Sequence, residues 1–236
     1  MVLLRHGETD RNAADRFQAQ ADVPLNDTGV RQAQDTARAL RPGKWAAVYS
    51  SPLARAAQTA AYAAGRLDVP HLRVDGLRER DLGALDGQDR AAFARRHPHT
   101  MRRLLTDPDY APPGGESGRA ARSRFAAALA GIAGTGPDPA ARPVLVVTHG
   151  GVLNLLTRAL TGAAAGAAPD ILIGTCAAAR VDTAWTPGGR PRFALRQWNV
   201  APHACEDPPP PPHPLPFVDL DDLTAEESDS KEVTRT

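Results

Sequence analysis

Five short apolar runs, separated by longer stretches with helical features, constrain the fold of this chain more than any other feature of its sequence. Each run is bounded by polar or turn residues, as short buried strands are. Strands that alternate with helices favour a largely parallel sheet with helices on both faces and right-handed crossovers. The predicted strands are Val2–Leu4, Ala46–Tyr49, Val144–Val147, Ala179–Asp182 and Phe193–Trp198.

Helix signals fill the stretches between these runs. Ser and Thr side chains can accept hydrogen bonds from the free N–H groups of a first turn, proline is tolerated there, and glycine commonly ends a helix. Gly134 and Gly162 are interpreted as two such ends. The predicted helices run from Thr28 to about Leu40, from Ser51-Pro52 to about Gly65, from Ser117 to about Ile132, and from Gly150-Gly151 to Gly162.

Chemically active side chains follow three of the predicted strands. Arg5 and His6 end the first, Arg55 lies one turn into the helix after the second, and His149 follows the strand that begins at Val144. The carboxyl ends of parallel strands share one edge of a sheet, where α/β proteins usually bind ligands. We therefore expect these four side chains to converge, although an Arg-His pair taken alone is more often an ordinary surface feature.

Two guanidiniums and two imidazoles around one cavity suit a phosphoryl group. Arginine offers fork-shaped donors to phosphate oxygens, and the helix starts near Ser51 and Gly150 would add backbone N–H groups. A histidine there is nucleophilic only if one ring nitrogen is unprotonated. A hydrogen bond from its other ring N–H to a backbone carbonyl would fix that tautomer.

Length and composition argue against several classes of protein. The 236 residues suffice for one sizeable domain, and no apolar stretch approaches the ~20 residues that span a bilayer. The net charge of +1 gives no reason to expect nucleic acid or an anionic membrane as partner. Cys176 and Cys205 form neither a disulfide framework nor a zinc motif. Because the chain enters its first strand at once, with no room for a signal peptide, we expect a cytoplasmic protein.

The C-terminal end differs in composition from the rest of the chain. Pro208–Pro216 reads PPPPPHPLP, and Phe217–Thr236 holds seven acidic and two basic residues. Such segments favour extended, solvated conformations over a packed core. We therefore expect one domain over residues 1–205 and a disordered tail over 206–236, in which a PxxP-type ligand is the less favoured alternative.

Several blocks of the sequence, in this order, resemble the histidine phosphatase superfamily, also called phosphoglycerate-mutase-like. The resemblance covers nearly all of residues 2–205 and implies a three-layer α/β/α fold. Its main blocks are LLRHGETDRN (Leu3–Asn12), SSPLARAAQTA (Ser50–Ala60), LRERDLGALDG (Leu77–Gly87), PPGGES (Pro112–Ser117) and VTHGGVLNLL (Val147–Leu156), with weaker matches at Arg16–Gly29 and Gln197–His203.

The resemblance implies a role for each matched residue. His6 would accept the phosphoryl group as phosphohistidine, with Arg5, Asn12, Arg55 and His149 holding it. Glu79 would protonate the leaving oxygen and then act as base toward water. No metal or cofactor is called for, because the arginines stabilise the charge. The alternative for Glu79 is a surface ion pair with Arg78 or Arg80.

Further matched positions imply contacts with phosphate or substrate. Gln18 matches a position at the substrate entrance, although the glycine often found beside it is Ala19 here. Gly150 follows His149, and Glu116 and Ser117 match a PGGES motif. For the last two, a helix start capped by Ser117 is an equally good interpretation. Asn154 lies within reach of the site or faces solvent.

The stretch after the Glu79 block favours a phosphatase over a mutase. Mutases of the superfamily carry a WRRSY-like segment there, and this chain has no tryptophan between Leu85 and Ser117. The stretch resembles instead the compact pattern of bacterial phosphatases acting on small phosphorylated metabolites. The alternatives are a cofactor-dependent phosphoglycerate mutase and a non-catalytic phospho-ligand-binding protein. Pairing of two chains into a homodimer through the sheet edge stays open.

Overall fold

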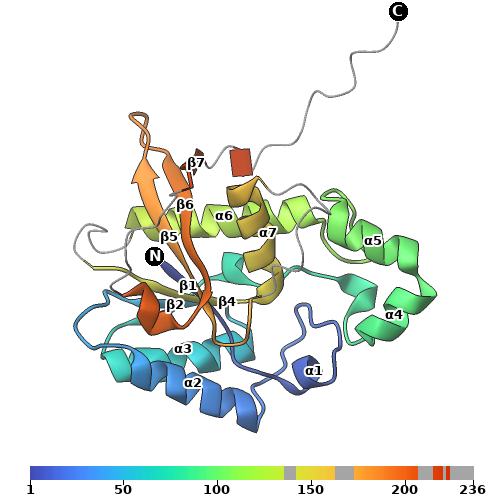
Figure 1. Ribbon diagram of the computed structural model, residues 1–236, viewed down its shortest axis with the longest axis horizontal. Coiled ribbons are helices and arrows are strands. Elements are labelled where there is room, and N and C mark those ends of the chain that lie inside the picture. Colours follow the sequence, from blue (N-terminus) through green and yellow to red (C-terminus); the bar gives the residue numbers. More distant parts are fainter. Residues whose placement is uncertain (136–141, 163–172, 207–214, 220–221, 224–236) are drawn as a thin grey trace, which may run out of the picture.

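A seven-stranded sheet, in the order β3-β2-β4-β1-β5-β6-β7, runs through the protein (Figure 1). The computed structural model describes residues 1–135, 142–162, 173–206, 215–219 and 222–223. Neighbouring strands are parallel from β3 to β1, and the rest of the sheet pairs antiparallel. The strands are β1 (Val2–Arg5), β2 (Val48–Ser50), β3 (His71–Arg73), β4 (Leu145–Thr148), β5 (Ala178–Trp185), β6 (Pro191–Val200) and β7 (Val218–Asp219).

Helices lie on both sides of this sheet (Figure 1). One layer holds α2 (Asp27–Ala39) and α3 (Ala54–Leu67), and the opposite layer holds α6 (Gly118–Thr135) and α7 (Gly150–Thr161). The predicted three-layer α/β/α fold is therefore confirmed. The remaining helical elements are α1 (Asp10–Ala13), α4 (Arg90–Arg96), α5 (Pro98–Thr106), and the short η1 (Asp75–Leu77), η2 (Gly83–Leu85) and η3 (Pro202–Cys205).

Several element ends differ from the prediction for identifiable reasons. Asn26, not Thr28, caps α2, because its side chain accepts a hydrogen bond from the N–H of Gly29. Helix α6 continues through Gly134, whereas Gly162 ends α7 in the left-handed conformation as predicted. The five predicted strands are present with shifted ends, and β3 and β7 were missed because neither has an apolar run. Among the described helices, none is both long and apolar enough to cross a membrane.

Both faces of the central strands are buried. Leu3 belongs to an apolar cluster with Phe125 of α6, whereas Leu4 belongs to a second cluster with Ala60 of α3. Successive side chains of a strand point to opposite faces, so a strand covered on both sides is apolar throughout. The continuous apolar runs of β1 and β4 follow from this burial.

A third apolar cluster lies apart from the sheet, under α4 and α5. It consists of Phe17, Leu85, Phe93 and Leu104. Figure 1 shows α4 and α5 standing out to one side of the sheet. This cluster fixes the two short helices beside the cavity described below, and we call residues 90–111 the side lobe.

The described residues after position 205 pack against the domain, so the predicted disorder does not hold for them. Val218 pairs with Phe193 across β6 and β7, and Leu223 is fully buried. The side chain of Glu206 accepts hydrogen bonds from the indole N–H of Trp45 and from the backbone N–H of Arg41. Residues 207–214, 220–221 and 224–236 lie outside the described residues, and the boundary at 205 stays a prediction.

Opposite charge and apolar side chains explain why this acidic segment docks. Arg192 forms an ion pair with Asp219, and the guanidinium of Arg196 lies 5.0 Å from the ring centre of Phe217. The backbone oxygen of Leu223 accepts a hydrogen bond from Arg122. The acidic composition of the tail concealed these apolar anchors.

We expect Leu223→Ala to destabilise the protein by about 2–5 kcal/mol, because it opens a cavity in the core. Leu72→Ala, at a leucine that is 42% exposed, serves as the matched control and should cost less than about 0.5 kcal/mol. Urea unfolding of the full chain measures both. Equal small losses for the two variants would show that the segment does not pack on the domain.

Candidate active site

The register of β1 and β4 brings two histidines together. Arg5 pairs with Thr148 across these parallel strands, so the next residues, His6 and His149, emerge side by side. Their ring centres are 5.2 Å apart in an edge-to-face arrangement. Both rings are buried. The convergence predicted from topology is therefore present for these residues.

A cavity of about 450 Å³ opens at this edge of the sheet. Six of the predicted site residues line it, and two others, Arg55 and His149, are fully buried and do not. His149 contacts the His6 ring, and the Arg55 charge acts on both histidines. The cavity-lining members of the predicted set are Arg5, His6, Asn12, Gln18, Glu79 and Gly150.

One hydrogen bond decides the tautomer of His6. Its Nδ1 lies 2.6 Å from the carbonyl oxygen of Gly7, and a carbonyl can only accept. Nδ1 therefore carries the proton and Nε2 keeps its lone pair. Gly7 is required here because a Cβ would lie 2.6 Å from the backbone oxygen of Gly29.

Burial keeps both histidines neutral. It lowers the pKa of His6 well below 6.5, and the charges of Arg55 and Arg5 lower it further. Burial likewise lowers the pKa of His149, with Arg55 as the next cause. Burial also lowers the pKa of Arg55, to about 10, so that this guanidinium stays protonated at neutral pH. The site therefore holds permanent cations beside an uncharged imidazole.

Several buried polar atoms around His6 lack partners among the described residues. Arg5 donates to the backbone oxygen of Ile173 and Arg55 donates to those of Ala19 and Ala21, but the Nε atoms of both arginines and both ring nitrogens of His149 make no hydrogen bond there. Buried polar groups in proteins are normally satisfied. The two Nε–H groups and the one N–H of the neutral His149 ring are therefore the natural donors to an anionic ligand.

Glu79 lies in the cavity wall and is buried, not part of a surface ion pair. Its Oε1 accepts the backbone N–H groups of Arg80 (2.7 Å) and Val152 (3.0 Å), and Oε2 accepts that of Gly151 (2.8 Å). Oε2 thus has one more free lone pair than Oε1. A side chain at Gly151 would displace this carboxylate, since a Cβ there would lie 2.4 Å from Oε1.

Asn12 and Gln18 are held at the cavity by Thr9. The Oδ1 of Asn12 accepts the backbone N–H of Thr9 in a capping box at the start of α1, which leaves its NH₂ group as the donor for a ligand. The Oε1 of Gln18 accepts the hydroxyl of Thr9 at 2.6 Å. Gly150 packs against Arg5, whose Nε would lie 3.3 Å from an added Cβ.

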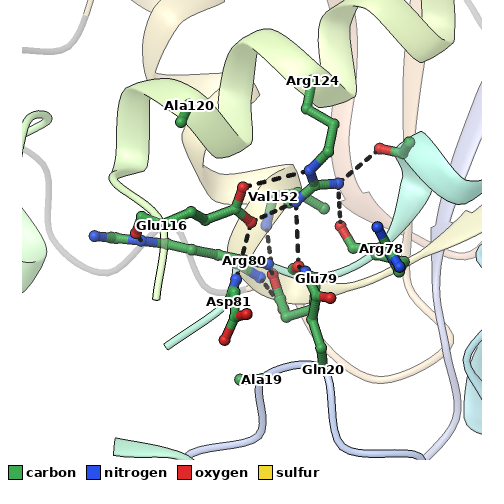
Figure 2. Close-up of polar contacts among 12 residues, drawn as sticks. Ala19, Gln20, Arg78, Glu79, Arg80, Asp81, Glu116, Ala120, Arg124 and Val152 are labelled. Atoms are coloured by element: carbon green, nitrogen blue, oxygen red, sulfur yellow. Dashed lines mark hydrogen bonds and ion pairs between the residues drawn. The ribbon is translucent and has the colours of Figure 1, made fainter. Parts of the chain in front are cut away.

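The placement of Glu116 and Ser117 argues against their predicted contact with substrate. Neither lines the cavity. Glu116 pairs with Arg124 of α6 (Figure 2). Ser117 accepts the backbone N–H of Ala120 in the first turn of that helix. The motif that suggested a substrate contact is here a helix start.

Sequence reasoning missed most of the outer cavity wall. Asn154 does line the cavity, and Arg158, four residues on along α7, lines it as well. That spacing places two side chains on one helix face and was a usable signal. The remaining cavity-lining residues, for which no site role was predicted, come from α7, from irregular segments and from the side lobe: Asp15, Arg16, Phe17, Arg80, Leu82, Arg90, Met101, Leu104, Leu105, Gly151, Leu155 and Ile173.

Within the described ranges, no three His, Cys, Asp or Glu side chains gather in a way that would hold a metal ion. The cations that face the cavity floor are guanidiniums instead. Cys176 and Cys205 are free thiols, and burial raises the pKa of each to about 11. Neither is therefore suited to act as a thiolate nucleophile at neutral pH.

Comparison with known proteins gives a consistent picture. The histidine phosphatase superfamily (branch 1) matches residues 1–200. The Uncharacterized phosphatase PhoE of Bacillus subtilis is 32% identical over 69% of this chain and 77% of its own length. The glucosyl-3-phosphoglycerate phosphatase of Mycobacterium tuberculosis is 31% identical over 88% of this chain and 97% of its own. A structure of the mycobacterial glucosyl-3-phosphoglycerate phosphatase with inorganic phosphate superimposes with a TM-score of 0.71 at 29% identity, covering 86% of this chain and 98% of that one.

The buried neutral histidines predict a loss of stability in acid. In the unfolded chain both take up protons near pH 6.5, whereas the folded state does so only at much lower pH. Their contribution to the free energy of unfolding is therefore fully present above pH 6.5 and is lost as pH falls below it, at up to about 1.4 kcal/mol per pH unit for each ring.

Urea unfolding between pH 7.5 and 5.5 should show that the free energy of unfolding depends less steeply on pH in His6→Gln and His149→Gln than in the wild type. The exposed His99→Gln should keep the wild-type slope; identical slopes in all four proteins would contradict this.

Proposed function

The chain belongs to the histidine phosphatase superfamily and is a phosphatase, and we propose that it hydrolyses phosphomonoesters through a phosphohistidine formed on Nε2 of His6. One observation carries this proposal. A neutral histidine with a fixed tautomer lies among buried guanidinium and imidazole groups, several of whose nitrogen atoms have no hydrogen-bond partner among the described residues. A phosphoryl group supplies the acceptors that these donors need.

In the first step, Nε2 of His6 attacks phosphorus while the ester P–O bond breaks. The guanidiniums of Arg5 and Arg55, the amide of Asn12 and the ring of His149 stabilise the charge on the transferred group. Glu79, protonated on Oε2, gives that proton to the leaving alcohol. The products are the free alcohol, a P–N bond to His6 and the Glu79 carboxylate, which the N–H groups of Arg80, Gly151 and Val152 bind.

In the second step, water attacks the phosphohistidine. Glu79 takes a proton from the water, the P–N bond breaks, and inorganic phosphate leaves with His6 neutral again. Fixed guanidiniums supply the charge stabilisation in both steps, and no metal takes part. Gln18 and Gly150 line the path of the ester and contact its phosphate or alcohol.

The substrate is a small phosphorylated metabolite. The cavity volume of about 450 Å³ suits such a molecule. The relative named glucosyl-3-phosphoglycerate phosphatase acts on an ester of this size class. The chain is also similar to a probable phosphoglycerate mutase of Proteus mirabilis, which is 35% identical over 77% of this chain. The mutase reaction is therefore measured as well.

We further propose that the enzyme works in the cytoplasm and without nucleic acid. Its two free cysteines fit a reducing compartment, and its net charge is close to zero. Among the described strands, β3 forms one edge of the sheet, and β7 covers part of β6 at the other edge, so we propose β3 as the edge at which a homodimer would pair. Sedimentation of the full chain measures the oligomeric state. A homodimer that is unaffected by substitutions in β3 would contradict the proposed interface.

Phosphate release from a panel of phosphomonoesters tests the proposed reaction. We expect turnover in the presence of a metal chelator, loss of turnover in His6→Ala, and a fall in kcat/KM of about 10²–10⁴-fold in Glu79→Gln for alkyl esters. The fall should be much smaller for p-nitrophenyl phosphate, whose leaving group needs no proton.

The same panel includes 3-phosphoglycerate, with the mutase product assayed in parallel. Interconversion of phosphoglycerates without phosphate release would establish a mutase. Phosphate binding without either reaction would establish a non-catalytic protein and overturn the proposal.

A further inference from the structure

Glu79 belongs to a segment without regular secondary structure. Residues 78–82 lie between η1 and η2 and pair with no strand. The backbone of a general acid nevertheless has to be fixed, because a displacement of about 1 Å at a catalytic group can cost about 10²-fold in rate. Figure 2 shows that side chains from elsewhere in the chain provide this support.

The guanidinium of Arg124 is the centre of that support. It reaches from α6 and donates to the backbone oxygens of Gly76 (2.8 Å), Arg78 (2.9 Å) and Glu79 (3.2 Å) (Figure 2). The amide of Gln20 donates to the same Glu79 oxygen at 3.0 Å. One planar fork thus binds three carbonyls over four residues, a geometry that the single ammonium of a lysine cannot reproduce.

Glu116 fixes the guanidinium in turn. Its Oε1 lies 2.6 Å from Nη2 of Arg124 and also accepts the backbone N–H of Asp81 at 2.9 Å. The carboxylate therefore holds both the guanidinium and the far side of the Glu79 segment (Figure 2). The side chains of Arg124 and Glu116 are only 23% and 21% exposed, which limits competition from water.

We propose that the Arg124–Glu116 pair is a positioning device that sets the reach of the Glu79 carboxyl group toward the leaving oxygen. The inference rests on the proposed role of Glu79 as general acid. Neither partner lines the cavity, so neither touches substrate. The pair acts through the Glu79 backbone, while the N–H groups of α7 orient the carboxylate itself.

A positioning role differs from general structural support in one measurable way. If the pair acts only through proton donation, its loss slows esters that need a proton on the leaving oxygen and spares those that do not. Its loss also adds nothing once Glu79 has no proton to give. General disruption of the cavity would slow all esters, with or without Glu79.

The test compares kcat/KM of Arg124→Gln, Arg124→Lys, Glu116→Gln and Glu79→Gln on alkyl phosphates and on p-nitrophenyl phosphate. We expect Arg124→Gln to lose about 10- to 100-fold on alkyl esters and less than about twofold on p-nitrophenyl phosphate. Arg124→Lys and Glu116→Gln should show the same selectivity for alkyl esters, with smaller losses of kcat/KM. These two variants replace Arg124→Gln in the test if Arg124→Gln does not fold. The double variant Arg124→Gln/Glu79→Gln should be no slower than Glu79→Gln.

Arg119→Gln is the matched control. Arg119 lies on the same helix and forms an ion pair with Asp109, and neither side chain forms any of the hydrogen bonds to the Glu79 segment described above. It should change neither ester. Equal losses on both ester types, a further loss in the double variant, or no loss in any Arg124 or Glu116 variant would overturn the inference. If Glu79→Gln loses the same kcat/KM on alkyl esters and on p-nitrophenyl phosphate, the proposed role of Glu79 is itself wrong. If Glu79→Gln is selective for alkyl esters but the Arg124 and Glu116 variants are not, only the positioning role is wrong.

Discussion

The hydrogen bond from Nδ1 of His6 to the backbone oxygen of Gly7 is the interaction on which the chemistry depends. It places the ring proton on Nδ1 and leaves Nε2 with a lone pair. A ring held this way among guanidiniums stays neutral, because burial and neighbouring positive charge both oppose protonation. The guanidiniums that add to the effect of burial on the pKa of His6 are then also available to bind the phosphoryl dianion. Nucleophile activation and substrate binding thus draw on the same two arginines.

The acid is supported differently from the nucleophile. His6 follows a buried strand and inherits its position from the sheet, whereas Glu79 lies in an irregular segment that side chains hold in place. Arg80 adds a connection to the side lobe, since its guanidinium donates to the backbone oxygens of Leu104 and Tyr110. The segment that carries the acid is therefore joined to the side lobe, in which Met101, Leu104 and Leu105 line the cavity.

The sequence was sufficient to predict the parts of the site that depend on regular structure. His6 and His149 converge because parallel strands end at one edge, and that rule needs only the strand pattern. The two interpretations of Glu116, a substrate contact and a residue beside a helix start, could not be separated because PGGES specifies a helix start but not the direction of the side chain that precedes it. Arg124 and Arg80 gave no signal, since most of their partners are backbone oxygens that no spacing rule identifies. β7 and Leu223 were missed because an acidic composition concealed a few apolar anchors.

The most direct test of the central claim is to identify the phosphorylated atom during turnover. The enzyme is mixed with a ³²P-labelled or unlabelled ester, quenched in base within the first turnovers, and examined by ³¹P NMR and by mass spectrometry of its peptides. The account predicts phosphate on Nε2 of His6, formed and lost at rates consistent with turnover. Phosphate on Nδ1, on another residue, or on no residue while phosphate is being released would contradict it.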